Sequence, residues 1–152
     1  MIKKPQEGMT LIVKVITRLT VGLIFIFGTY IMLHGHLTPG GGFAGGVIIA
    51  LSFIHLVLAF GKNQALKKIS RSVASYFESF GAIMFLTVAL LGFVIGGFFI
   101  NFLHRQGQET FKLFSSGSIL LSNIAICIKV GAGLFAIFAA LAFLNISQGD
   151  KK

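Results

Sequence analysis

The sequence predicts an all-α integral membrane protein with four transmembrane helices, short loops and both termini in the cytoplasm. Composition is the first indication, because hydrophobic residues make up 55% of the 152 positions and charged residues only 11%. Four apolar stretches, each of about 18 residues or more, are long enough to cross a hydrocarbon core of about 30 Å. These stretches leave almost no chain for a soluble domain, so we expect a single membrane domain over residues 1–152.

The expected spans follow one another with short connections. Lysines precede the first apolar run, as in a signal peptide, but the run continues to Leu33 without a small-residue cleavage site, which favours a retained helix. The second span is short and contains Ser52 and His55. The third carries Glu78 near its start, and the fourth carries Lys129. We expect these spans at residues 11–33, 43–60, 73–102 and 118–144.

Basic residues are distributed unevenly between the two sides that the spans define. Ten of the thirteen lie near the termini, at the start of the first span or in the loop after the second. Because Lys and Arg concentrate in cytoplasmic loops, this bias predicts cytoplasmic termini. It also accounts for the net charge of +9 through attraction to anionic lipid, so nucleic-acid binding is not needed to explain that charge. The ten are Lys3, Lys4, Lys14, Arg18, Lys62, Lys67, Lys68, Arg71, Lys151 and Lys152.

Lys129 is the most informative single residue of the fourth span. It lies eleven residues after Ser118, or about 16 Å along a helix, which is roughly half of the hydrocarbon core. A lysine at this depth costs about 2.5–3.5 kcal/mol on insertion scales, and the surrounding Leu, Ile, Phe and Val residues offset that cost. Ionisable groups inside membrane spans usually face protein or water and mark functional sites. Lys129 is therefore either a structural lock to a carboxylate on another subunit or a lysine that changes protonation during transport.

Small residues at helical spacing surround both intramembrane charges and predict close helix packing. Glu78 has two interpretations: a carboxylate that pairs near Arg71 at the start of its helix, or a proton or sodium way-station. The expected packing faces are Glu78, Ala82, Ala89, Gly92 and Gly96 in the third span, and Ser118, Ser122, Ala125, Lys129, Ala132 and Ala136 in the fourth.

The turn between the first two spans is rich in glycine and histidine. Pro39 disfavours helix in the residues before it, and the glycines after it permit unusual backbone angles. Gly42 and Gly46 are four residues apart, so they predict a face where another helix backbone comes close. A tight packed hairpin is one interpretation of this turn; the other makes His34 and His36 relay groups for protons or cations at the outer boundary. The turn and packing positions are Pro39, Gly40, Gly41, Gly42, Gly45 and Gly46.

The remaining chemistry-bearing residues argue against an active site of the chain's own. The i,i+2 spacing of His34 and His36 does not place both on one helix face, so we expect no metal site there. His55 is either a satisfied histidine between helices or an ion-path residue. Because we find no metal-ligand cluster, no nucleophile–base pair and no cofactor motif, we expect a non-catalytic chain without a cofactor.

The segment HGHLTPGGGFAGGVIIA resembles the signature of the B-type (MnhB-domain) subunit of Mrp-type multisubunit sodium/proton antiporters. Related subunits occur in membrane-bound energy-converting hydrogenases and related sulfur reductases, and the resemblance covers essentially the whole chain. It implies a multi-pass protein of the prokaryotic plasma membrane whose partners are other membrane subunits. The fourth span has Ile128, Lys129, Val130 and Gly131 where the antiporters carry a Phe-Asp-[Ile/Leu]-Gly stretch. Residues 128–131 of this chain and the region before them look more like the hydrogenase-associated branch of the family.

Together these features predict an accessory subunit of a sodium/proton-translocating membrane complex, coupled to a hydrogenase or reductase. Its ion-path candidates are Lys129, Glu78, His34, His36 and His55. Two alternatives stay open at this point: a purely structural subunit that braces such a complex, and a subunit of a stand-alone Mrp antiporter. In each case any redox chemistry would belong to other subunits.

Overall fold

The structure is a computed structural model that describes residues 8–61, 71–97, 99–101 and 116–149. Within these ranges the chain forms four helices and no strand: α1 (Leu11–Leu33), α2 (Gly41–Phe60), α4 (Arg71–Ile95) and α5 (Ser118–Gly149). All four are long and apolar enough to cross a membrane. The expected all-α membrane architecture is therefore confirmed. The basic residues of the 62–70 loop and of both termini, which carried the expected orientation, lie outside the described residues.

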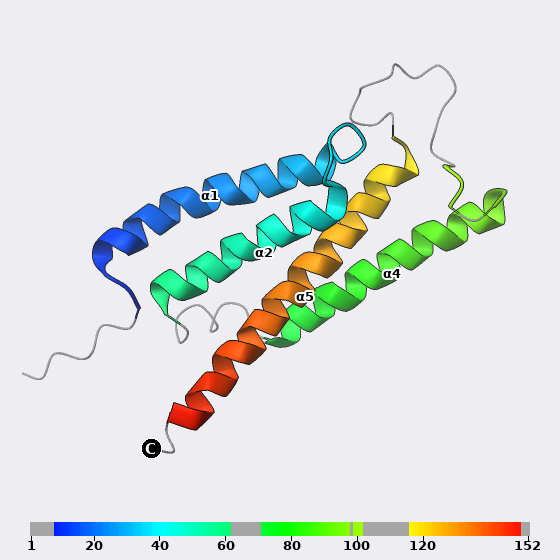
Figure 1. Ribbon diagram of the computed structural model, residues 1–152. Helices are drawn as coiled ribbons and strands as arrows, with labels where there is room; N and C mark the ends of the chain where they lie inside the picture. The colour runs from blue at the N-terminus through cyan, green and yellow to red at the C-terminus, as the bar shows by residue number, and fades with distance from the viewer. Residues whose placement is uncertain (1–7, 62–70, 98, 102–115, 150–152) are drawn as a thin grey trace, which may run out of the picture.

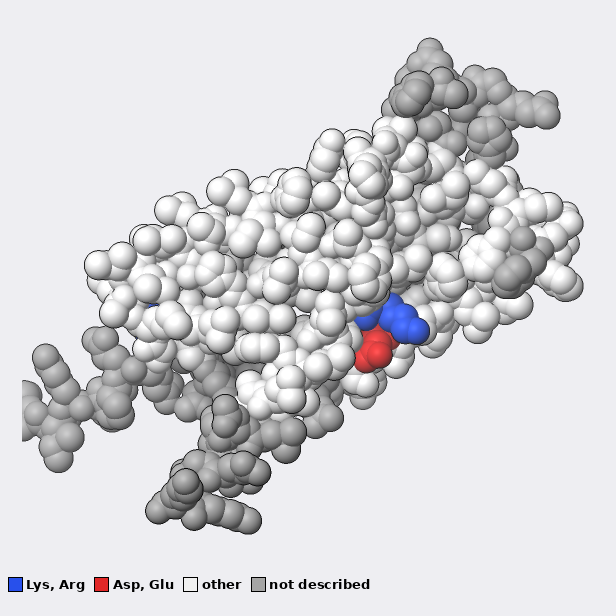
Figure 2. All heavy atoms as spheres, viewed as in Figure 1, with Lys and Arg blue, Asp and Glu red and all other residues white. Residues whose placement is uncertain are grey.

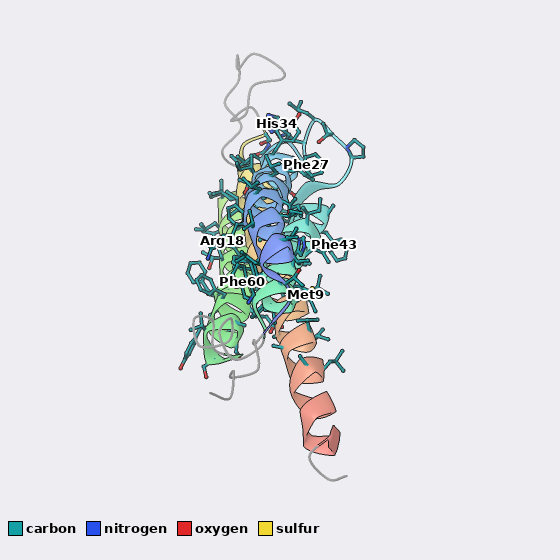
Figure 3. The ribbon with its side chains drawn as sticks, turned by 90° about the vertical axis from the view of Figure 1, so that its left-hand side faces the viewer. Met9, Arg18, Phe27, His34, Phe43 and Phe60 are labelled. Carbon is teal, nitrogen blue, oxygen red and sulfur yellow. The ribbon has the colours of Figure 1, made fainter. Side chains whose placement is uncertain are left out.

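The helices are arranged as a single layer rather than as a bundle around a central core. Their spatial order is α1, α2, α5 and α4, so the last helix of the chain lies between the second and the third (Figure 1). A view turned by 90° shows the layer from its edge, with Arg18 and Phe60 on one broad side and Phe43 on the other (Figure 3). The C-terminal end of α5 projects beyond the ends of the other three helices (Figure 1).

The helix ends follow local chemistry. α2 begins at Gly41, two residues earlier than expected, because Gly40 and Gly41 adopt positive φ angles of 132° and 60° that let the chain turn directly into the helix. α4 ends at Ile95, well before the expected residue 102. Gly96 and Gly97 follow, and both of their N–H groups donate to the Gly92 carbonyl at 3.1 Å. Consecutive glycines favour such an end because they gain little from continuing a helix.

Few side chains are buried in a layer of this kind. The buried residues are mostly small, and among the described residues a compact apolar cluster forms where α2, α4 and α5 meet, around Val57, Ala74 and Phe135. Large apolar side chains cover both broad faces and both edges, as expected for a surface that contacts lipid or other transmembrane helices.

Candidate functional site

Glycines bring the α2 backbone into close contact with both of its neighbours. A Cβ atom added to Gly46 would lie 2.8 Å from the Cys127 carbonyl oxygen of α5, and one added to Gly42 would collide with the Asn123 backbone. On the other side, a Cβ atom on Gly45 would lie 2.9 Å from the Gly28 carbonyl oxygen of α1. Real Cβ atoms do not come this close to backbone, so α2 can occupy its place only with glycine at these positions.

Gly81 makes the corresponding approach between α4 and α5. A Cβ atom there would lie 2.7 Å from the Lys129 backbone nitrogen and 2.9 Å from the Ala125 carbonyl oxygen. Ala125 is completely buried at this contact. One turn away, the Glu78 carboxyl carbon would lie 3.7 Å from a Cβ atom on Gly133. The α4–α5 contact therefore places Glu78 and Lys129 on adjacent turns of neighbouring helices.

The Lys129 side chain is exposed in this structure, and Glu78 is partly exposed. Glu78 is the acidic residue of the described ranges, so it accounts for the red atoms in Figure 2, which lie beside basic atoms on the open face of the layer. The two charged side chains thus face outward from the α4–α5 contact. The described part of the chain leaves this side of the α4–α5 contact open.

Both charges lie near the middle of the layer. α2 and α5 run parallel, with Gly42 opposite Asn123 and Gly46 opposite Cys127, so the same offset places Gly133 level with Ser52. Ser52 is eight residues before the end of α2, or about 12 Å along the helix. Since Glu78 lies against Gly133, the register places it at about this depth, which agrees with its position seven residues after the start of α4, or about 10 Å along the helix. It is separated from Lys129 by about one helical turn, roughly 6 Å.

The histidine and glycine turn lies at the end of the layer where α1 meets α2. His34 follows α1, stacks on Tyr30 with ring centroids 4.3 Å apart, and donates from Nδ1 to the Tyr30 carbonyl at 3.1 Å. The Thr38 hydroxyl and backbone N–H donate back to the His34 carbonyl. His36 is partly buried in the same turn, and Pro39 is exposed. The turn is therefore internally hydrogen-bonded.

His55 lies apart from the other candidates, in the α1–α2 contact. Its Nε2 is 3.4 Å from the hydroxyl of Thr17, a side chain that is only 1% exposed. Ser52, one turn away and equally buried, donates its hydroxyl to the Ile49 carbonyl at 2.7 Å. The structure thus brings Lys129 and Glu78 together, gathers His34 and His36 in the turn, and leaves His55 in a separate contact.

Several residues that position these groups were missed from the sequence. Asn123 accepts the Gly42 N–H at 3.3 Å across 81 residues, which caps the start of α2 from another helix. Asn101 does the same for α5, accepting the Ser118 N–H at 2.8 Å. Both asparagines lie inside expected apolar spans, Asn101 at the end of 73–102 and Asn123 in 118–144, and a lone asparagine in such a span was the available signal. Gly81 and Thr17 carried no distinguishing signal. Among the described residues, no group of three or more His, Cys, Asp or Glu side chains could hold a metal ion.

Comparison with known proteins identifies the family. Residues 12–136 match the family described as a domain related to the MnhB subunit of Na+/H+ antiporters. A putative antiporter subunit, mnhB2, of Staphylococcus aureus (strain Newman) is 28% identical over 136 residues, covering 90% of this chain and 92% of that protein. An uncharacterized protein of Methanocaldococcus jannaschii, MJ1307, is 38% identical over 117 residues, covering 74% of this chain.

A solved structure is similar along most of the chain. It is a chain of the membrane-bound sulfane sulfur reductase, an archaeal respiratory membrane complex, with a TM-score of 0.74, 33% identity and 91% of the present chain covered. The present chain spans 62% of that protein and 44% of the M. jannaschii protein. The chain therefore belongs to the MnhB family, and with its four spans it is a multi-pass protein of the prokaryotic plasma membrane.

Proposed function

We propose, starting from this family membership, that the chain is a non-catalytic accessory subunit of a multisubunit ion-translocating complex. The complex would contain an Mrp-antiporter-like sodium/proton exchange module coupled to a membrane-bound hydrogenase or reductase. The similarity to antiporter subunits supports the exchange module, and the similarity to a chain of a membrane-bound reductase complex supports the coupling. In this proposal any redox reaction takes place in other subunits. Both termini face the cytoplasm, which labelling of a Lys67→Cys variant from either side would test.

The observation that carries the proposal is the open position of Lys129 and Glu78 on a single layer of helices. A layer leaves both charges at the middle of the membrane on a face that the described residues leave open. Exposure of either charge to lipid would cost several kcal/mol, about 2.5–3.5 for the lysine alone. A neighbouring subunit that covers this face, with water between the two, would remove that cost.

The two side chains have the chemistry that an ion path requires. A carboxylate can bind a proton or a sodium ion, and a nearby ammonium competes with either cation for it. Because Lys129 and Glu78 lie on adjacent turns, movement of the flexible lysine side chain toward or away from Glu78 would change the cation affinity of the carboxylate. The pair would thus couple arrival of an ion to a local charge rearrangement.

The alternative functions use the same contacts differently. In a purely structural subunit, Lys129 would pair permanently with a carboxylate of a neighbour and hold the complex together. In a stand-alone Mrp antiporter, the exchange role would remain but no hydrogenase or reductase would be attached. The similarity to an antiporter subunit covers 90% of the chain and supports the exchange module. Both complexes would contain that module, so this similarity is expected for either of them.

Separate replacement of the two charges in the intact complex distinguishes a path from a brace. We expect Lys129→Met and Glu78→Gln to leave the complex assembled but to reduce sodium-dependent proton exchange in membrane vesicles at least tenfold. The matched control is Ile137→Met, which changes an exposed α5 side chain without removing a charge. Loss of assembly in both charge variants, with normal assembly of the control, would instead favour the brace.

A further inference from the structure

Arg18 lies on the opposite broad face from the open charge pair and is not used by the proposed ion path. Its guanidinium carbon is 5.3 Å from the centre of the Phe60 ring, a cation–π contact between α1 and the last residue of α2 (Figure 3). The contact fixes the position of a charge that would otherwise be free to move.

The position of this charge relative to the membrane follows from the α1–α2 contact. Thr17 lies against His55, five residues before Phe60, so the Arg18 backbone is about six residues deeper than Phe60, or roughly 9 Å. The guanidinium nevertheless reaches Phe60, at the end of the span. Arg18 therefore extends toward the membrane surface, as long basic side chains near span ends do.

The chemistry around Arg18 suits an anion. Lys14 lies one turn closer to the surface on the same side of α1, because residues four apart share a helix face. The Arg18 guanidinium contacts the Phe60 ring, and no hydrogen bond or ion pair within the described ranges engages its N–H groups. A guanidinium offers a planar fork that matches phosphate oxygens.

An apolar track continues from Arg18 toward the membrane interior. Gly22 is one turn deeper on the same side of α1, and a Cβ atom added there would meet no atom within 4 Å. One turn further in, Phe25 packs edge-to-face on Phe53 of α2, with centroids 6.1 Å apart. The missing side chain at Gly22 leaves open space on this side of α1, between Arg18 and these rings.

We propose that Arg18, Lys14 and Phe60 form a binding site for the phosphate of an anionic phospholipid, with one acyl chain lying over Gly22 toward Phe25. A lipid fits better than a free phosphate ion because the polar and apolar parts of the site follow each other along the helix, at the depths of a headgroup and its chain. Basic pockets between transmembrane helices are a common place for anionic headgroups.

The test measures lipid retention in the purified, assembled complex. Native mass spectrometry after delipidation and re-addition of phosphatidylglycerol or phosphatidylcholine would give relative occupancies. We expect preferential retention of phosphatidylglycerol, and a decrease of about fivefold in Arg18→Gln, which corresponds to the loss of about 1 kcal/mol per basic residue near the surface. Excess inorganic phosphate should not displace the lipid, whereas displacement would show that the site binds a free anion and would overturn the lipid assignment.

Two further variants separate this site from general charge effects. Arg71→Gln removes an equal charge at the start of α4 and should leave retention unchanged. Gly22→Leu places a side chain in the open space beside Gly22 without a steric conflict. It should lower the retention of phosphatidylglycerol while the protein remains folded. The proposal is overturned if Arg71→Gln lowers retention as much as Arg18→Gln. It is equally overturned if retention in Arg18→Gln is unchanged.

Discussion

The α1–α2 and α4–α5 contacts are both brought close by glycine, yet they treat polar groups in opposite ways. Between α1 and α2, Thr17 and Ser52 are buried and only 1% exposed. Between α4 and α5, the Lys129 backbone is packed against Gly81 while its side chain points out of the contact. The size and charge of the polar group explain the difference.

A hydroxyl can be satisfied inside a helix contact because the helix supplies its own acceptor. Ser52 donates to the carbonyl three residues before it, and Thr20 of α1 donates to the Ile16 carbonyl at 3.1 Å. An ammonium has three donors and a full charge, which a dry contact between two backbones cannot satisfy. The α1–α2 contact therefore has a structural role. The α4–α5 contact instead exposes the charged side chains of Lys129 and Glu78 to its surroundings.

The largest effect is expected at the α2–α5 contact, which joins these two halves. Gly46→Leu should prevent the subunit from folding or assembling, because the new side chain would enter the α5 backbone at Cys127. Overpacking of this kind costs about 1–3 kcal/mol or more when backbone must move. Yield of assembled complex and its thermal stability would measure the loss. Gly22→Leu is the matched control, and normal assembly of both variants would refute close packing at Gly46.

A charge exchange tests whether the α4–α5 contact acts as a pair. Lys129→Glu and Glu78→Lys alone should each reduce sodium-dependent proton exchange more than tenfold. The double variant should recover part of that activity, because residues that belong to one polar network typically show coupling of about 0.5–3 kcal/mol. Vesicle assays on equal amounts of assembled complex provide the measurement. No recovery in a normally assembled double variant would mean that the two charges act through separate partners.

Removal of the Asn123 cap should have a smaller, purely structural effect. In Asn123→Ala the Gly42 N–H at the start of α2 loses its acceptor, and a lost cap or buried hydrogen bond costs about 1–2 kcal/mol. We expect a lower melting temperature with exchange activity per assembled complex unchanged. A stability equal to that of the original protein would show that water or the turn itself can replace the amide.

The smallest effect is expected in the α1–α2 contact. Thr17→Val keeps the shape of the side chain but removes the oxygen near His55, and hydrogen bonds between membrane helices average about 0.6 kcal/mol. Stability should fall slightly and exchange should stay within twofold. If Thr17→Val abolished exchange in assembled complexes, His55 would belong to the ion path and the contrast between the two contacts would fail.

The sequence predicted the helices better than their arrangement. Long apolar runs determine the existence of the spans, and the Gly96–Gly97 pair explains the early end of α4 that hydropathy alone did not reveal. Helix order in space depends on contacts between distant residues, such as Gly42 with Asn123, which no local pattern indicates. The packing face of α4 was placed on Ala82, whereas Gly81 makes the close approach to α5.

The site was predictable in its residues but not in its geometry. Lys129 stands out because a charge in the middle of an apolar run is costly. Glu78 was placed near the start of its span, and its relation to Lys129 follows only from the α4–α5 register at Gly133. The relation between the two charges was thus beyond the sequence, although both were identifiable.

The position of α5 between α2 and α4 has a consequence for biogenesis. α1, α2 and α4 precede α5 in the sequence, so they leave the ribosome before the helix that separates α2 from α4. Until α5 has been inserted, Gly46 of α2 and Gly81 of α4 lack the helix that they contact in the folded protein. Insertion of α5 then completes both contacts at once, which makes it the step that joins the four helices into one layer.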